Sequence, residues 1–159
     1  MYGGKAENLI LLRDGGIPVP EFVVVTDGKA PEISWELSSV RSSADVEDGA
    51  TDSFAGQFDT YLGVAENELQ EKIDMCMASA SNEGAAEYLK QREIGKDVKM
   101  SVIVQKMIEA DCSGVMFTSN PQGIMNECVI TVGKGTGDNV VTDKTDTTSY
   151  YYNTNDDLY

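Results

Sequence analysis

The sequence of 159 residues contains no histidine, only three cysteines and no long hydrophobic segment. The lack of histidine excludes serine–histidine and cysteine–histidine nucleophiles, histidine metal ligands and a phosphohistidine within this sequence. The cysteines, Cys76, Cys112 and Cys128, are odd in number and show no CxxC spacing. They therefore indicate neither a disulfide framework nor a zinc site, and they are typical of a protein from a reducing compartment.

Hydrophobic runs and basic residues are also scarce. The apolar run at residues 9–12 is too short for a signal peptide, and no stretch approaches the roughly 20 apolar residues of a membrane span. We therefore expect a cytoplasmic protein. With 12 basic and 27 acidic residues the formal charge is −15. Such a surface repels nucleic acid and anionic lipid, so we expect neither nucleic acid nor membrane as a partner, although solubility alone also explains the charge.

The first part of the sequence mixes helix and strand patterns, whereas the second part contains mainly strands. Apolar spacing and turn residues predict helices at 6–13, 66–80 and 83–92, strands at 22–26, 35–40 and 58–64, and a polar loop at 44–57. Further strands are predicted at 100–108, 112–118, 127–132 and, more weakly, 149–152, and the first two are close enough for a hairpin. We therefore expect an α+β fold with a mixed first lobe, 1–97, and a mostly antiparallel β second lobe, 98–159.

Two short segments have residue types suited to binding phosphate. Gly4 and Lys5 open the first predicted helix, where backbone amides, the helix dipole and an ammonium group all favour an anion. Arg41, Ser42 and Ser43 follow the strand predicted at 35–40, and a guanidinium can hold a phosphate through two hydrogen bonds while hydroxyls complete the cradle. By composition alone, phosphate binding is not the better explanation of either segment. A flexible chain start explains the first segment better, and a surface turn explains the second better. A P-loop is excluded because no GxxxxGK[ST] pattern occurs.

Two further segments suit other parts of a nucleotide. Ser53, Gly56 and Gln57 lie in a stretch that can close over a ligand as a lid, or equally form a hairpin turn. Gln105 and Met107 end an apolar strand, and an adenine ring needs an apolar slot with backbone hydrogen bonds at such an edge. For these two residues a core strand is the better explanation from composition alone.

Six motifs between residues 3 and 121 strengthen these assignments by their common order. They are GGKAENL (3–9), IPVPEFVVVT (17–26), VRSSADVED (40–48), SFAGQFDTYL (53–62), VIVQKMI (102–108) and SGVMFTSNP (113–121). Together they closely resemble the ATP-grasp nucleotide-binding domain of phosphoenolpyruvate synthase, pyruvate phosphate dikinase and the related rifampicin phosphotransferases. The resemblance implies an ATP-grasp-like fold of two lobes with the nucleotide between them, and ATP and Mg²⁺ as cofactors.

The resemblance also implies roles for particular residues. Lys5 and Arg41 match the lysine and arginine of the family that contact the phosphates, and residues 53–60, ending at Thr60, match its lid. Gln105 and Met107 match the strand that borders adenine. In these enzymes ATP phosphorylates a histidine on a swivelling domain, which passes the phosphoryl group to an acceptor. Because this sequence has no histidine, we expect that histidine on a separate domain or chain.

The sequence departs from the family pattern in spacing and in its last motif. Only 35 residues separate Lys5 from Arg41, fewer than is usual in the family. Where the family has a Glu-Ala-x-x-Gly-Leu-Gly-Glu block, residues 131–138 have Thr131 at the first glutamate position and Asp138 at the second. Asp138, or as a second choice Glu127, is the expected magnesium ligand. Lys144 is a candidate to replace a missing arginine, as a point charge without the guanidinium fork.

Three interpretations remain open from the sequence. The chain is the ATP-binding component of a split phosphotransferase, or a regulatory module that binds nucleotide without catalysis, or a degenerate fold kept for protein interaction. Lys5, Arg41 and the intact stretch 53–57 favour the first interpretation. Thr131 and the absence of a histidine domain from this sequence favour the other two.

Overall fold

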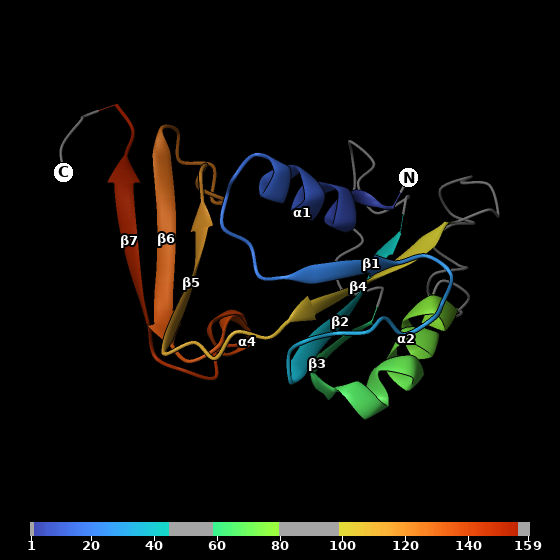
Figure 1. Cartoon of the computed structure of the whole chain (residues 1–159). Coiled ribbons are helices and arrows are strands. Elements are labelled where there is room, and N and C mark those ends of the chain that lie inside the picture. The colour runs from blue at the N-terminus through green and yellow to red at the C-terminus, as the bar shows by residue number, and fades with distance from the viewer. Residues whose placement is uncertain (1, 45–58, 80–98, 156–159) are drawn as a thin grey trace. The chain divides into compact units, whose positions relative to one another are not determined.

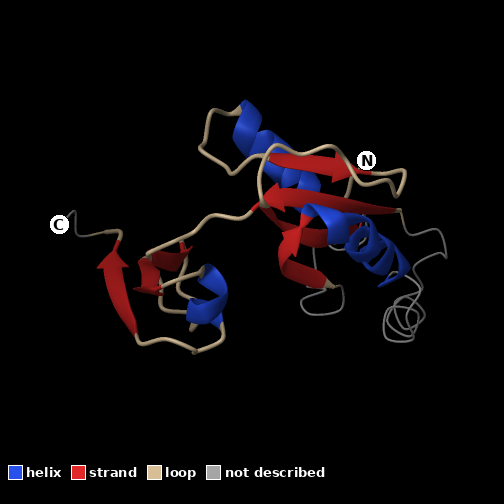
Figure 2. Ribbon diagram, turned by 60° about the horizontal axis from the view of Figure 1, so that its bottom comes forward, coloured by secondary structure: helices blue, strands red, loops and turns tan. Residues whose placement is uncertain are grey.

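The computed structural model describes residues 2–44, 59–79 and 99–155 (Figure 1). The chain divides into two compact units, Met1–Met107 and Ile108–Tyr159. Both units combine helices with antiparallel strands, which confirms the α+β class (Figure 2). No helix in the described ranges is both long enough and apolar enough to cross a membrane. The helix expected at 83–92 and most of the loop expected at 44–57 lie outside the described residues.

The first unit is built on a four-stranded antiparallel sheet with the order β1-β4-β2-β3. Its strands are β1 Phe22–Val25, β2 Leu37–Ala44, β3 Thr60–Ala65 and β4 Met100–Lys106. β4 and β2 are the central pair, held in continuous register from Ser38 opposite Lys106 to Ala44 opposite Met100. The middle of β4 is buried on both faces, as a central strand with an uninterrupted apolar run is expected to be.

Helices α1 (Gly4–Asp14) and α2 (Leu69–Ala78) lie on opposite sides of this sheet (Figure 1). A short 3-10 helix, η1 (Glu66–Glu68), leads into α2. Side chains alternate along a strand, so Val40 and Ser43 of β2 point to opposite faces. The backbone of α1 bonds to Ser43, whereas α2 packs on the face that carries Val40.

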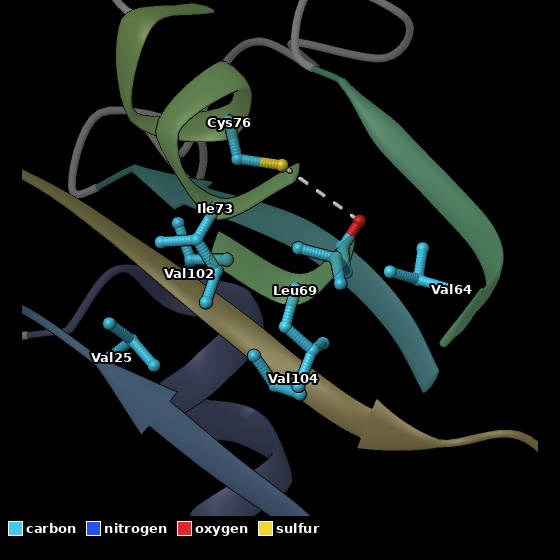
Figure 3. Packing of buried hydrophobic residues seen from close by; sticks show 8 residues of the cluster. Val25, Val64, Leu69, Ile73, Cys76, Val102 and Val104 are labelled. Atoms are coloured by element: carbon cyan, nitrogen blue, oxygen red, sulfur yellow. Dashed lines mark hydrogen bonds between the residues drawn. The ribbon is translucent and has the colours of Figure 1, made fainter. Parts of the chain in front are cut away.

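The core of the first unit lies between α2 and the sheet (Figure 3). Leu69, Ile73 and Cys76 recur at the helical spacing of four and three residues, and all three are fully buried. They pack against valines of the central strands, which also have no exposed surface; these are Val40, Val102 and Val104. Removal of this apolar surface from water is the main stabilising contribution in this unit.

The second unit is a three-stranded antiparallel sheet with the order β5-β6-β7 and one short helix. The strands are β5 Cys112–Phe117, β6 Glu127–Lys134 and β7 Thr147–Asn153, and the helix is α4 Gly137–Val141. Val140 of α4 is buried, as are Cys128 and Val129 of β6. β7 confirms the weak strand expected at 149–152 and is longer than expected.

Three sequence expectations require correction or adjustment. The hairpin expected between residues 100–108 and 112–118 is wrong, because β4 pairs with β1 and β2 while β5 pairs with β6. A boundary between residues 97 and 98 was expected, whereas the division falls between Met107 and Ile108 and β4 belongs to the first sheet. The strand expected at 35–40 runs on to Ala44, so Arg41 and Ser42 lie inside β2 and not after it.

Candidate functional site

Lys5 and Arg41 come together at β2 of the first unit. Lys5 is in the first turn of α1, and its Nζ lies 3.4 Å from the backbone oxygen of Ser42. Arg41 is the residue before Ser42 and is paired directly with Thr60 of β3. Directly paired residues of an antiparallel sheet have Cβ atoms roughly 5 Å apart. The structure thus places three residues expected from the sequence, Lys5, Arg41 and Thr60, around one stretch of β2.

Arg41 differs from Arg13 and from several lysines in its surroundings. Its side chain is half-buried, and within the described residues no carboxylate forms an ion pair with it. Acidic partners lie within 3.1 Å of four other basic side chains, those of Arg13, Lys72, Lys106 and Lys144. A half-buried guanidinium without a counter-charge favours the binding of an anion, and its planar fork suits phosphate oxygens.

The two serines after Arg41 have different surroundings. Ser42 is 1% exposed, and its hydroxyl donates to the backbone oxygen of Asp59 at 3.2 Å. That hydroxyl therefore secures β2 to the start of the next strand. Ser43, which shares the sheet face of Arg41, accepts a hydrogen bond from the backbone N–H of Ala6 at 3.1 Å. The sequence placed both serines in the candidate phosphate segment, and the two-residue period of a strand is the signal that separates them.

The glycine pair before Lys5 lets α1 approach the sheet closely. Gly3 precedes the helix with φ of 81°, a region that favours glycine, and Gly4 is the first helical residue. A Cβ at Gly3 would lie 2.7 Å from the backbone carbon and oxygen of Ser43. The sequence predicted that these glycines allow backbone to approach an anion. In the structure, Gly3 allows backbone to approach β2.

Gln105 lies on the same sheet face as Arg41, at the far end of the central strand pair. In the register of β2 and β4, Ser39 is opposite Gln105 and Arg41 is opposite Ile103. Gln105 is 8% exposed, and its Nε2 donates to the backbone oxygen of Pro20 at 3.4 Å. Met107 is half-buried and extends the strand pairing by one residue, because its N–H donates to the oxygen of Leu37 at 2.9 Å.

The two candidate metal ligands lie in the second unit and flank β6. Glu127 is the first residue of β6, and its Oε1 accepts a hydrogen bond from Asn120 Nδ2 at 2.5 Å. Asp138 follows the strand in α4, and its Oδ2 is 3.1 Å from Lys144 Nζ. A strand rises roughly 3.3 Å per residue, so the eight residues of β6 keep these carboxylates too far apart to share an ion.

The described residues offer no ready-made cage for a metal. In residues 2–44, 59–79 and 99–155, no group of three or more histidine, cysteine, aspartate or glutamate side chains is arranged to hold an ion. Thr131, at the position where the resemblance implies a glutamate, has its hydroxyl 2.9 Å from that of Ser149. A magnesium ion can bind through one or two carboxylates together with phosphate oxygens and waters. Asp138 fits that requirement only as a single ligand.

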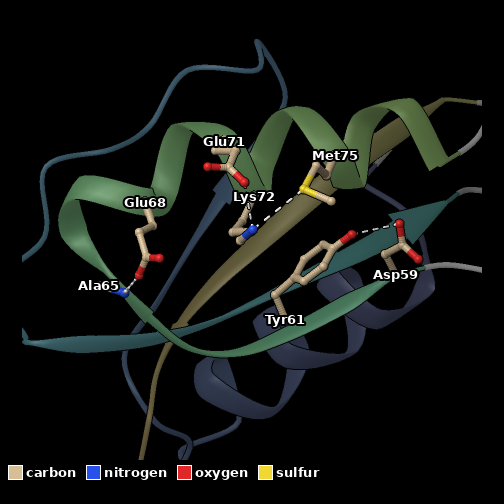
Figure 4. A network of polar contacts seen from close by, with 7 residues as sticks. All are labelled: Asp59, Tyr61, Ala65, Glu68, Glu71, Lys72 and Met75. Atoms are coloured by element: carbon tan, nitrogen blue, oxygen red, sulfur yellow. Dashed lines mark hydrogen bonds and ion pairs between the residues drawn. The ribbon is translucent and has the colours of Figure 1, made fainter.

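Asp59, just before β3, is hydrogen-bonded to Tyr61 of that strand (Figure 4). The hydroxyl of Tyr61 donates to Asp59 Oδ2 at 3.0 Å, and burial together with this bond and the negative charge raises the pKa of Tyr61 to about 12. Burial, and then the charge of Asp59, raises the pKa of the Cys76 thiol to about 12. The backbone of Ser42 and the charge of Lys5 act in the opposite direction on that thiol.

Three residues of the predicted lid, Ser53, Gly56 and Gln57, lie outside the described residues. Thr60, the last residue of that stretch, begins β3 and is exposed.

Comparison with known proteins gives matches over most of the sequence. The family described as "Pyruvate phosphate dikinase, AMP/ATP-binding domain" matches residues 27–158, which include Arg41 and begin after Lys5. The prodigiosin synthesizing transferase PigC of Serratia marcescens is 44% identical over 149 residues, which are 92% of this chain and 16% of the relative. A probable phosphoenolpyruvate synthase of Archaeoglobus fulgidus is 40% identical over 116 residues, 72% of this chain and 15% of the relative.

A rifampicin phosphotransferase of a Streptomyces species is also similar, with 36% identity over 132 residues, 80% of this chain and 15% of the relative. The chain thus spans about 15–16% of the length of these curated relatives. The family model covers well over half of the sequence, which confirms the resemblance inferred from the six motifs. This chain therefore belongs to the family of the pyruvate phosphate dikinase AMP/ATP-binding domain.

Proposed function

We propose that this chain binds the triphosphate of ATP at Lys5 and Arg41. The observation that carries the proposal is the approach of Lys5 Nζ to the backbone of Ser42, directly beside an Arg41 guanidinium without a carboxylate partner in the described part of the chain. Such a grouping of cations is notable in a protein with a formal charge of −15. Gly4 and Thr60, which adjoin this pair, are further proposed contacts.

The remaining site residues are proposed from the resemblance. Gln105 and Met107 border the adenine ring, and Ser53, Gly56 and Gln57 belong to a lid over the phosphates. Ser42, whose hydroxyl is bonded to Asp59, contributes through its backbone. We further propose that the two units are the lobes of an ATP-grasp-like fold, divided after Met107.

We propose Asp138 as the protein ligand of a magnesium ion that accompanies ATP. A metal ion neutralises phosphate charge, and phosphoryl transfer depends mainly on positioning and on such neutralisation. Lys144, now paired with Asp138, would then be released to contact phosphate. The acceptor is proposed to be a histidine on a separate domain or chain, because this sequence contains none.

Calorimetric titration of the full chain with ATP and ADP, with and without Mg²⁺, tests this function. Each of Lys5→Ala and Arg41→Ala is expected to weaken binding by a factor of about 10 or more, because hydrogen bonds to charged groups contribute about 1.5–3 kcal/mol. Arg41→Lys is expected to recover only part of the loss, since the fork is missing. Lys29→Ala, which removes the same charge from an exposed loop position, serves as the matched control.

Absence of both heat and a thermal shift at millimolar nucleotide would contradict the proposal. Equal losses in Lys29→Ala and Arg41→Ala would also contradict it, because they would indicate only a general charge effect.

One observation favours a second candidate function, a regulatory module that binds nucleotide without catalysis. Thr131 presents a hydroxyl bonded to Ser149 where the resemblance implies a metal-binding carboxylate. Loss of a metal carboxylate weakens the charge neutralisation that phosphoryl transfer needs. Binding of ATP that is insensitive to Mg²⁺ and to Asp138→Asn would favour this candidate over the phosphotransferase.

A further inference from the structure

The N-terminal end of α1 is attached to the central strands by a compact set of polar contacts. The backbone N–H of Ala6 donates to Ser43 Oγ at 3.1 Å. Ser101 Oγ lies in hydrogen-bonding reach of two backbone oxygens, those of Tyr2 and Ser43, the latter at 3.1 Å. A single hydroxyl proton serves one of these acceptors at a time. The bond to Tyr2 attaches the chain before α1 to β4, whereas the bond to Ser43 links β4 to β2.

These two serines occupy positions where a strand usually carries apolar side chains. Ser43 of β2 and Ser101 of β4 are directly opposite each other in the register, and they are 0% and 2% exposed. A buried hydroxyl is costly unless it is hydrogen-bonded. Ser43 Oγ accepts the N–H of Ala6 in α1, and Ser101 Oγ reaches the backbone oxygen of Tyr2, just before α1. Their polarity therefore serves the attachment of the helix, because apolar packing of the strands alone would not require it.

Close steric fit adds to these hydrogen bonds. Gly3 lies so near Ser43 that a Cβ there would be 2.7 Å from three of its atoms. Lys5 follows two residues later, and its Nζ is 3.4 Å from the oxygen of Ser42. The place of Lys5 relative to Arg41 therefore depends on how tightly the start of α1 is held against β2.

We infer that Ser43 and Ser101 are positioning residues for the nucleotide: they hold the start of α1 against the central strands so that Lys5 lies beside Arg41. This inference rests on the proposed function of Lys5 and Arg41. Neither serine needs to touch the ligand. Their effect on binding passes through Lys5, because displacement of a phosphate-binding ammonium by even a fraction of an ångström weakens a charge-assisted hydrogen bond.

A double-mutant cycle separates this role from a general effect on stability. Ser43→Ala and Ser101→Ala are each made in the wild-type chain and in Lys5→Ala, and ATP dissociation constants are measured by calorimetry. In the wild-type background each change is expected to weaken binding about 3- to 10-fold, as the loss of one hydrogen bond would. In the Lys5→Ala background the same changes are expected to have almost no effect, because coupled residues are not additive.

Two further variants control the experiment. Ser101→Thr keeps a hydroxyl on a strand position and is expected to restore most of the affinity lost in Ser101→Ala. Ser38→Ala removes another fully buried hydroxyl of β2, one that contacts Trp35 Nε1 at 2.8 Å and not α1, and it is expected to leave ATP affinity unchanged. Thermal unfolding of every variant establishes that binding is measured on folded protein. If Ser43→Ala does not fold, the comparison of Ser101→Ala with Ser101→Thr is sufficient to test the inference.

The possible failures are distinguishable. In one outcome, ATP binds and Lys5→Ala weakens its binding, but the effects of the serine changes on affinity add to that of Lys5→Ala or are no larger than that of Ser38→Ala. This inference is then wrong while the proposed function stands. If the wild-type chain binds no ATP, the proposed function is wrong and this inference with it.

Discussion

At the scale of single residues, Asp59 organises the region behind the proposed phosphate contacts (Figure 4). Its backbone oxygen accepts hydrogen bonds from both the N–H and the hydroxyl of Ser42, at 3.3 and 3.2 Å, and lies 3.7 Å from Cys76 Sγ. Its carboxylate accepts the hydroxyl of Tyr61. One residue thus joins β2, β3 and α2, and nothing in its sequence context indicated this role, because each contact depends on the folded chain.

The three thiols are expected to differ sharply in reactivity. Cys76 is fully buried, and its pKa is raised to about 12, so almost no thiolate is present at pH 8. Cys112 is exposed, whereas Cys128 is 7% exposed. We expect a thiol reagent at pH 8 to label native protein rapidly at one site, and Cys112→Ser to abolish that phase. Mass spectrometry of labelled peptides checks the assignment, and rapid labelling of Cys76 would contradict its burial.

Tyr61 provides a pH-dependent contribution to stability. Its pKa is raised from 10.0 to about 12, so the folded state holds the phenolic proton more tightly than the unfolded state does. The contribution is therefore complete below pH 10 and is lost as the pH rises from 10 to 12. Tyr61→Phe is expected to lower the free energy of unfolding by about 1 kcal/mol at pH 8 and by less at pH 11.

Denaturant unfolding at both pH values measures this difference. Tyr150→Phe, at a tyrosine that is 57% exposed, is the control and is expected to have little effect at either pH. A loss in Tyr61→Phe that is the same at pH 8 and pH 11 would show that the hydrogen bond to Asp59 is not its source.

At the scale of elements, α2 contributes three of the eight buried residues in the apolar core of the first unit (Figure 3). Ile73→Ala removes a fully buried side chain that faces Val102 and Val104, and such truncations usually lower the free energy of unfolding by about 2–5 kcal/mol. Met75 lies on the same helix but is 41% exposed, so Met75→Ala is expected to cost less than about 1 kcal/mol. Similar losses in the two variants, measured by urea unfolding, would mean that α2 does not pack as described.

The elements also show where sequence patterns are sufficient and where they are not. The helical spacing of Leu69, Ile73 and Cys76 predicted both α2 and its buried face, because that period is a local property. The hairpin expected for β4 and β5 was wrong, because strand pairing depends on which distant segment supplies hydrogen bonds and apolar contacts. β4 is buried in the centre of the first sheet, between β1 and β2, and not beside its neighbour in sequence.

At the scale of the whole molecule, the formal charge of −15 is expected to oppose the approach of ATP. Free ATP carries more negative charge than its magnesium complex, so low ionic strength should favour the complex strongly. Raising the salt concentration from about 0.01 to about 0.15 M shortens the Debye length from roughly 30 to roughly 8 Å. We therefore expect the ratio of the dissociation constants without and with Mg²⁺ to fall as salt is added.

The part of this ratio that remains at high salt reports metal ligation and not long-range charge. Calorimetry on Asp138→Asn checks this assignment. In this variant the preference for the magnesium complex is expected to disappear at high salt, whereas the preference seen only at low salt is expected to remain. A ratio unaffected by salt would show that the acidic surface does not influence nucleotide binding.

The sequence by itself determined the family, because six motifs in a fixed order are a property of the chain that needs no coordinates. It also selected Lys5 and Arg41, although only the structure shows that Lys5 Nζ reaches the backbone of Ser42, the residue after Arg41. The sequence named Ser42 and Ser43 together, because the alternation of side chains identifies a face only once the ends of the strand are known.

Only the tertiary structure decided which sheet contains β4 and that the start of α1 is attached through Ser43 and Ser101. The physical reason is common to both. Helical and strand periods are set by neighbouring residues, whereas register, strand order and the partners of buried hydroxyls are set by segments far apart in the sequence that meet only in the folded chain.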